Sequence, residues 1–135
     1  MSTPNETPGN VAPVTVLVVD DDKMFLELMT ELLGEAGFVP IAAGSAAETA
    51  TLLAEHPEVA LMMCDIDLRS NGNGVAIAQD ARERRPDLPI LFISGHSTQL
   101  ADSIMADLNH VSFLQKPFRW EQLAATLDAI LTSDQ

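Results

Sequence analysis

Residues 14–22 read Val-Thr-Val-Leu-Val-Val-Asp-Asp-Asp, an apolar run that ends in three consecutive carboxylates. Three other short apolar runs also lead into polar residues: 61–64 into Asp65, 90–93 into Ser94, and 111–115 into Lys116 and Pro117. In an open parallel α/β sheet, the carboxyl ends of the strands border one crevice where ligands bind. We therefore expect the fold to collect carboxylates, a hydroxyl and an ammonium at one edge of a sheet.

Segments with helical spacing of apolar residues lie between these runs, so strands and helices alternate along the chain. The predicted strands are 14–19, 38–43, 59–64, 89–93 and 111–114, and the predicted helices are about 23–36, 45–55, 75–85, 98–108 and 119–132. Ser45 and Glu48 form a capping-box pattern, and Gly37 stands where a helix C-terminal glycine belongs. This alternation predicts an α/β fold with helices on both faces of a parallel sheet, and right-handed crossovers make it doubly wound.

The length of 135 residues fits one domain with a single core. Residues 1–13, with three prolines and a glycine, predict a disordered tail. The domain then covers 14–132, and 133–135 form a short C-terminal tail. Residues 69–74 are a loop by composition. We recognise no second domain in the sequence, so we expect a stand-alone domain.

Charge and cysteine content disfavour several classes of protein. Seven Lys and Arg against 20 Asp and Glu give a formal net charge of −13, which opposes direct binding to nucleic acid or to an anionic membrane. The single cysteine, Cys64, cannot form a disulfide within the chain, so a reducing cytoplasm is the simplest compartment. We find no secretory signal pattern and no apolar run long enough to insert across a membrane.

The carboxylates of residues 20–22 repel one another, and crowding raises carboxyl pKa values unless a cation neutralises the charge. Mg²⁺ is the natural candidate because it prefers hard oxygen ligands. The alternative is that Asp20, Asp21 and Asp22 only cap the following helix and favour its dipole. The triplet alone does not decide between these two interpretations.

Asp65, Ser94 and Lys116 supply the remaining chemistry. A carboxylate can accept a phosphoryl group covalently, and a nearby cation aids its attack. The Ser94 hydroxyl can donate to a phosphoryl oxygen, and the Lys116 ammonium can pair with a carboxylate or a phosphate. Each residue has an ordinary alternative, namely a turn aspartate, a loop serine and a solvated lysine. Their order at successive strand ends favours a phosphoryl-accepting site.

At these positions the chain resembles the receiver domains of bacterial two-component response regulators, over about residues 14–132. The matching segments are Val18-Val-Asp-Asp-Asp22, Cys64-Asp-Ile-Asp-Leu68, Phe92-Ile-Ser-Gly95 and Phe113-Leu-Gln-Lys-Pro-Phe118. The resemblance implies a flavodoxin-like (βα)₅ sheet with strand order 2-1-3-4-5. It also implies a phospho-accepting signalling protein rather than an enzyme.

The resemblance assigns a metal site. Asp65 corresponds to the phospho-accepting aspartate, and Asp20 and Asp21 correspond to the acidic pair that holds Mg²⁺, Asp21 directly and Asp20 largely through water. The backbone carbonyl of Asp67 completes the metal ligands. Asp67 and His96 also stand at the two positions that tune phosphoryl lifetime in the family.

The resemblance assigns a switch as well. Ser94, in place of the more frequent threonine, follows the phosphoryl group, and Phe113, in place of a common tyrosine, is the aromatic switch. Lys116 corresponds to the family's invariant lysine. The loop after the phospho-accepting aspartate differs from the common pattern, because Arg69 stands where proline is usual.

The implied phosphoryl donor is a histidine kinase or a histidine phosphotransferase, which would dock on Met24, Leu28 and Pro117. For Met24 and Leu28 the alternative is that both are core residues of a wide apolar stripe. A downstream protein target is expected on the face formed by helix 98–108, strand 111–114 and helix 119–132.

Two other functions remain open from the sequence. A receiver-fold adaptor would signal without phosphorylation. A haloacid-dehalogenase-like phosphatase would use Asp65 and Asp67 as nucleophile and acid, but that motif normally follows the first strand.

Overall fold

A single sheet of five parallel strands organises the part of the chain that the computed structural model describes, residues 13–66, 74–95 and 110–132. The strands are β1 (Thr15–Val19), β2 (Val39–Ala43), β3 (Val59–Asp65), β4 (Ile90–Ser94) and β5 (Val111–Gln115). Their order is β2-β1-β3-β4-β5, and every neighbouring pair is parallel. The predicted doubly wound, flavodoxin-like order is confirmed.

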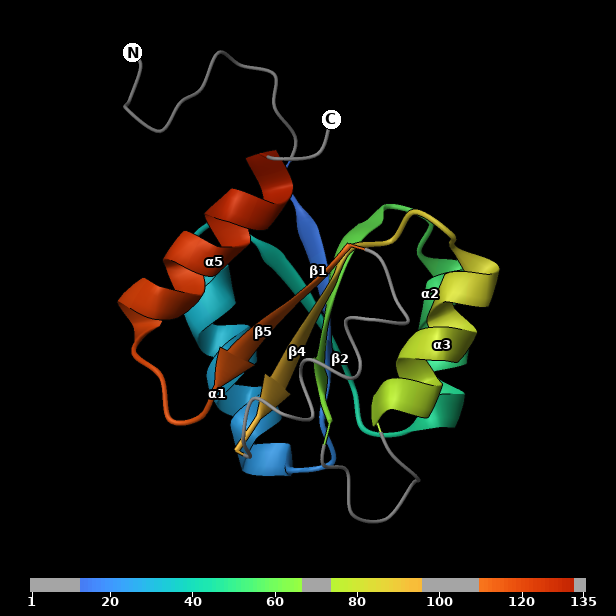
Figure 1. Cartoon of the computed structure of the whole chain (residues 1–135), viewed down its shortest axis with the longest axis horizontal. Helices are drawn as coiled ribbons and strands as arrows, with labels where there is room; N and C mark the ends of the chain where they lie inside the picture. The colour runs from blue at the N-terminus through green and yellow to red at the C-terminus, as the bar shows by residue number, and fades with distance from the viewer. Residues whose placement is uncertain (1–12, 67–73, 96–109, 133–135) are drawn as a thin grey trace.

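The helices of the described residues are α1 (Lys23–Glu35), α2 (Ala46–Glu55), α3 (Gly74–Arg84) and α5 (Trp120–Thr132). Figure 1 shows α1 and α5 on one side of the sheet and α2 and α3 on the other. None of these helices is long and apolar enough to cross a membrane. The predicted helix over 98–108, residues 1–12 of the predicted N-terminal tail and the predicted C-terminal tail over 133–135 lie outside the described residues.

The central strands are buried on both faces, because successive side chains of a strand point to opposite sides of the sheet. On β1, Leu17 and Val19 pack in the core beneath α2 and α3, whereas Val16 and Val18 pack in the core beneath α1 and α5. This alternation between two cores explains the near-continuous apolar runs in the sequence. It leaves the strand ends as the place where polar side chains can gather.

Local sequence signals determine where α2 begins and where α1 ends. The Ser45 side chain accepts the Glu48 amide at 3.1 Å and so caps α2. The Glu48 carboxylate accepts the amide of Gly44 at 2.6 Å, one residue earlier than a standard capping box would have it. Gly37 follows α1 with a φ of +100°, which is the left-handed conformation that glycine adopts without strain.

Several predicted boundaries are corrected near the strand ends. β3, β4 and β5 each end one residue later than predicted, so Asp65, Ser94 and Gln115 are the last residues of their strands. Gly74, predicted to end a loop, is instead the first residue of α3, and its amide donates to the Ile66 carbonyl at 3.0 Å. A Cβ at residue 74 would overlap the backbone carbonyl of Asp65, so this close approach requires glycine.

Candidate functional site

Three carboxylates meet at the carboxyl end of the sheet. Asp20 and Asp21 follow β1, Asp65 ends β3, and each offers an oxygen within 4.8 Å of those of the other two. The strands are neighbours with Val19 beside Cys64, which brings the two strand ends together. The predicted gathering of these three carboxylates is confirmed.

Lys116 reaches this cluster from the end of β5. Its Nζ lies 3.7 Å from Oδ2 of Asp65 and 3.8 Å from Oδ2 of Asp20. These are ion-pair distances, too long for hydrogen bonds. The Lys116 backbone amide donates to the Ser94 carbonyl at 2.8 Å, which joins the ends of β4 and β5. One ammonium therefore stands between two carboxylates.

Asp20 is the most enclosed carboxylate of the cluster, with 1% of its surface exposed. Its Oδ1 accepts the Asp22 amide at 2.8 Å, and its Oδ2 is buried without a hydrogen-bond partner. Burial raises the pKa of Asp20 from 3.8 to about 6, with the charge of Asp65 adding to the rise and the Asp22 amide opposing it. A buried carboxylate oxygen without a donor, beside two further carboxylates, suits a hard cation such as Mg²⁺.

Asp20→Asn should therefore stabilise the metal-free protein above pH 6. The folded state binds the Asp20 proton more tightly than the unfolded state, so this group's contribution to stability is present at low pH and is lost as the pH rises from about 4 to 6. The rise of the Asp20 pKa from 3.8 to about 6 corresponds to about 3 kcal/mol. Because Asn also weakens the attraction to Lys116, we expect a gain of about 1 to 3 kcal/mol.

Urea unfolding in EDTA at pH 4 and pH 7.5 measures this effect. The stabilisation by Asp20→Asn should be present at pH 7.5 and largely absent at pH 4. Asp128→Asn, at an exposed position on α5, is the matched control and should show no such difference. Equal or lower stability of Asp20→Asn at pH 7.5 would contradict the expectation.

Asp22 does not belong to the carboxylate cluster. It is the N-cap of α1, and its side chain accepts the amides of Met24 at 3.0 Å and Phe25 at 3.2 Å. The capping interpretation of the acidic triplet is thus correct for Asp22, while its two neighbours join Asp65. The carbonyl of Asp67, predicted to bind metal, lies outside the described residues, as does His96.

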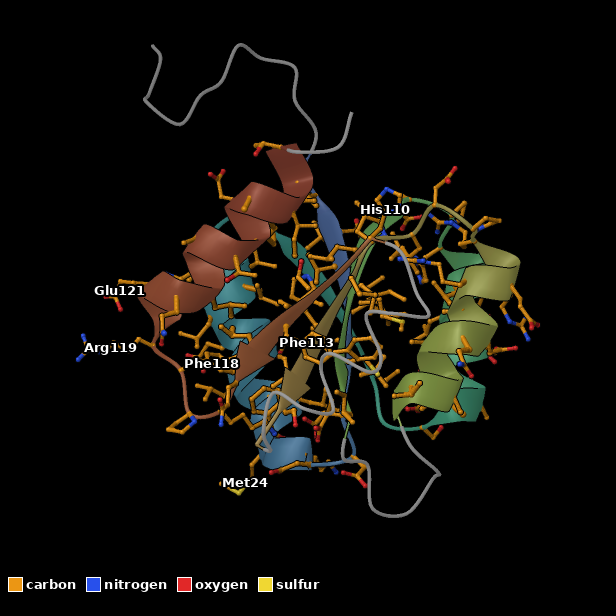
Figure 2. The ribbon with its side chains drawn as sticks, in the orientation of Figure 1. Met24, His110, Phe113, Phe118, Arg119 and Glu121 are labelled. Carbon is orange, nitrogen blue, oxygen red and sulfur yellow. The ribbon has the colours of Figure 1, made fainter. Side chains whose placement is uncertain are left out.

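The two predicted switch residues lie on neighbouring strands. Ser94 is buried at the end of β4, one position beyond Ile93, which pairs with Asp65. Phe113 lies on β5 (Figure 2) with its ring centroid 5.4 Å from that of Phe92, at an interplanar angle of 31°. Their positions suit the predicted roles, and the switching itself stays a prediction.

Met24 and Leu28 are 77% and 51% exposed, so the interpretation that both are core residues is wrong. Figure 2 shows Met24 at the end of the molecule toward which β4 and β5 run, opposite His110. Pro117, the third predicted docking residue, is also exposed. Docking on these residues stays a prediction.

The sequence did not reveal an apolar groove of about 280 Å³ beside the cluster. Its walls come from α1, through Phe25, Leu28 and Leu32, and from the segment after β5 and the start of α5, through Pro117, Phe118 and Trp120. These two segments are far apart in the chain. The sequence signal nearest to it was the predicted docking surface, because Leu28 and Pro117 both line the groove.

The family model for the response regulator receiver domain matches residues 16–128. A putative NtrX-like response regulator of Rickettsia bellii is 30% identical over 115 residues, which are 84% of this chain and 24% of that protein. The photosynthetic apparatus regulatory protein RegA of Cereibacter sphaeroides is 31% identical over 104 residues, 76% of this chain and 55% of RegA. The chain therefore spans about a quarter of the NtrX-like relative and about half of RegA.

Solved structures match the fold closely. A response regulator receiver protein from Sinorhizobium medicae WSM419 superposes with a TM-score of 0.79 at 29% identity, covering 92% of this chain and 98% of that one. The receiver domain of NtrX from Brucella abortus has a TM-score of 0.79 at 25% identity, covering 88% and 99%.

Proposed function

Because this chain belongs to the response regulator receiver domain family, we propose that it accepts a phosphoryl group on Asp65 from a histidine kinase or a histidine phosphotransferase. The observation that carries the proposal is the meeting of three carboxylates with the Lys116 ammonium at one end of the sheet. Receiver domains are signalling proteins, and they bind Mg²⁺ at an acidic pocket of this kind.

In the proposed reaction, a carboxylate oxygen of Asp65 attacks the phosphorus of a phosphohistidine. An O–P bond forms, the P–N bond breaks, and the leaving imidazole takes up a proton from solvent. The Lys116 ammonium, 3.7 Å from Asp65, offsets the charge of the incoming phosphoryl group, and the Ser94 hydroxyl donates to one of its oxygens. Asp20, Asp21 and Asp65 would hold Mg²⁺, whose charge reduces the repulsion between carboxylate and phosphoryl oxygens.

We propose that the phosphorylated protein signals through contacts with other proteins rather than through nucleic acid, in keeping with a net charge of −13. The proposed output face includes β5 and α5, where Arg119 and Glu121 project outward (Figure 2). Inward movement of Ser94 and repacking of Phe113 would alter this face. A cytoplasmic location stays a prediction. A stand-alone domain also stays a prediction, because the relatives extend beyond the matched region.

Incubation with acetyl phosphate and Mg²⁺, read by intact mass, tests this function. We expect a mass increase of one phosphoryl group, stable in acid and labile in base. EDTA should lower the labelling rate at least about a hundredfold, because a metal contributes several kcal/mol to such a transition state. No adduct, under conditions that label a known receiver, would contradict the proposal and favour the phosphorylation-independent adaptor.

The haloacid-dehalogenase-like alternative has no support from the fold. Asp65 ends the third strand, β3, rather than the first. Sustained turnover of a small phosphate ester in the same assay would be needed to revive it.

A further inference from the structure

We propose that Phe25 is a positioning residue that holds the Lys116 ammonium through the face of its ring, an inference that rests on the proposed function. Phe25 lies in the first turn of α1, and Nζ of Lys116 is 4.6 Å from the centroid of its ring. This distance is within the roughly 6 Å at which a cation over an aromatic face is attracted by the ring quadrupole.

The two carboxylates alone hold this ammonium loosely. Its distances to Asp65 and Asp20 exceed hydrogen-bonding length, and 33% of the Lys116 side chain is exposed. A lysine is a flexible four-carbon stem with a compact charge, so it needs several contacts to stay in one place. The carboxylates approach from β1 and β3, and Phe25 adds a contact from a third element, α1.

Phe25 is itself held in place. It is partly buried against the core beneath α1 and α5, and its backbone amide donates to the Asp22 cap at 3.2 Å. Phe25 and Lys116 both line the apolar groove between α1 and the segment after β5. Loss of the ring would let water from this groove surround the ammonium, and solvation weakens its attraction to the carboxylates and to a phosphoryl group.

Three variants test this role in the intact chain. Phe25→Leu keeps an apolar side chain but removes the ring, and Phe25→Tyr keeps the ring. Phe38→Leu removes an aromatic ring elsewhere in the same core. With acetyl phosphate at saturating Mg²⁺, Phe25→Leu should be labelled about five- to thirtyfold more slowly than wild type, the range that a partly buried cation–π contact provides. Phe25→Tyr and Phe38→Leu should keep the wild-type rate within about twofold.

Two further measurements separate positioning from a general structural defect. Mg²⁺ affinity by calorimetry should be unchanged in Phe25→Leu, because Phe25 contributes no carboxylate. In NMR spectra, the ring should shift the protons next to Nζ of Lys116 upfield in wild type and in Phe25→Tyr, and this shift should disappear in Phe25→Leu.

If Phe25→Leu were labelled at the wild-type rate, or if the rates of Phe25→Leu and Phe25→Tyr fell equally, the positioning role would be overturned and the proposed function would stay intact. Failure of the wild type to be labelled would overturn the proposed function, and the positioning role with it. The two failures are therefore distinguishable.

Discussion

Asp65→Asn should abolish labelling by acetyl phosphate and leave the fold intact. An amide oxygen is a far weaker nucleophile than a carboxylate, so we expect a loss of at least about a thousandfold, below detection by intact mass. Asn has nearly the same shape and fits the same buried position at the end of β3. Loss of the Asp65 charge also removes one of the interactions that raise the pKa of Asp20. The variant should therefore unfold no earlier than wild type.

Asp22→Asn is the matched control for this substitution. Asp22 caps α1 and lies outside the carboxylate cluster, and Asn is about as effective as Asp at a helix N-cap. The control should be labelled at the wild-type rate. An adduct of normal yield on Asp65→Asn would mean that another residue accepts the phosphoryl group.

Gly74→Ala should destabilise the protein even though alanine is the better helix former. The substitution gains up to about 1 kcal/mol of helix propensity. The added Cβ, however, would overlap the Asp65 carbonyl, and it would lie only 2.9 Å from the Asp65 carbonyl carbon and from the Ile66 Cα. Backbone atoms cannot turn away as a side chain can, and overpacking of this kind costs about 1 to 3 kcal/mol or more. We expect a net loss of about 2 kcal/mol, or a fall in Tm of about 5 to 10 °C.

Because the clash falls on the backbone of the phospho-accepting residue, Gly74→Ala should also slow labelling of the protein that remains folded. Gly34→Ala is the control, since nothing lies within 4 Å of a Cβ at that position in α1. It should raise Tm slightly through helix propensity and leave labelling unchanged. A Gly74→Ala protein as stable as wild type and as readily labelled would show that the contact is relieved at no cost.

Much of the candidate site could be predicted because it follows from chain-wide rules. Parallel strands end at the same edge of a sheet, so the placement of Asp20, Asp65 and Lys116 followed once the apolar runs were recognised as strands. Side-chain exposure could not be predicted in the same way. Met24 and Leu28 fit a helical apolar stripe as well as they fit an exposed docking surface, and periodicity alone does not say where a helix face ends.

The sequence by itself determined the alternation of strands and helices and the strand ends at which Asp20, Asp65 and Lys116 stand, because these depend on local periodicity and on general rules for parallel sheets. The strand order and the predicted roles of the site residues came from the family resemblance. Only the tertiary structure decided which aspartates of the triplet join the cluster, how deeply Asp20 is buried, why residue 74 must be glycine and that Phe25 faces Lys116. Each of these facts depends on how close segments that are far apart in the chain come to one another. Those approaches are set by the packing of the strands and helices, which no local pattern encodes.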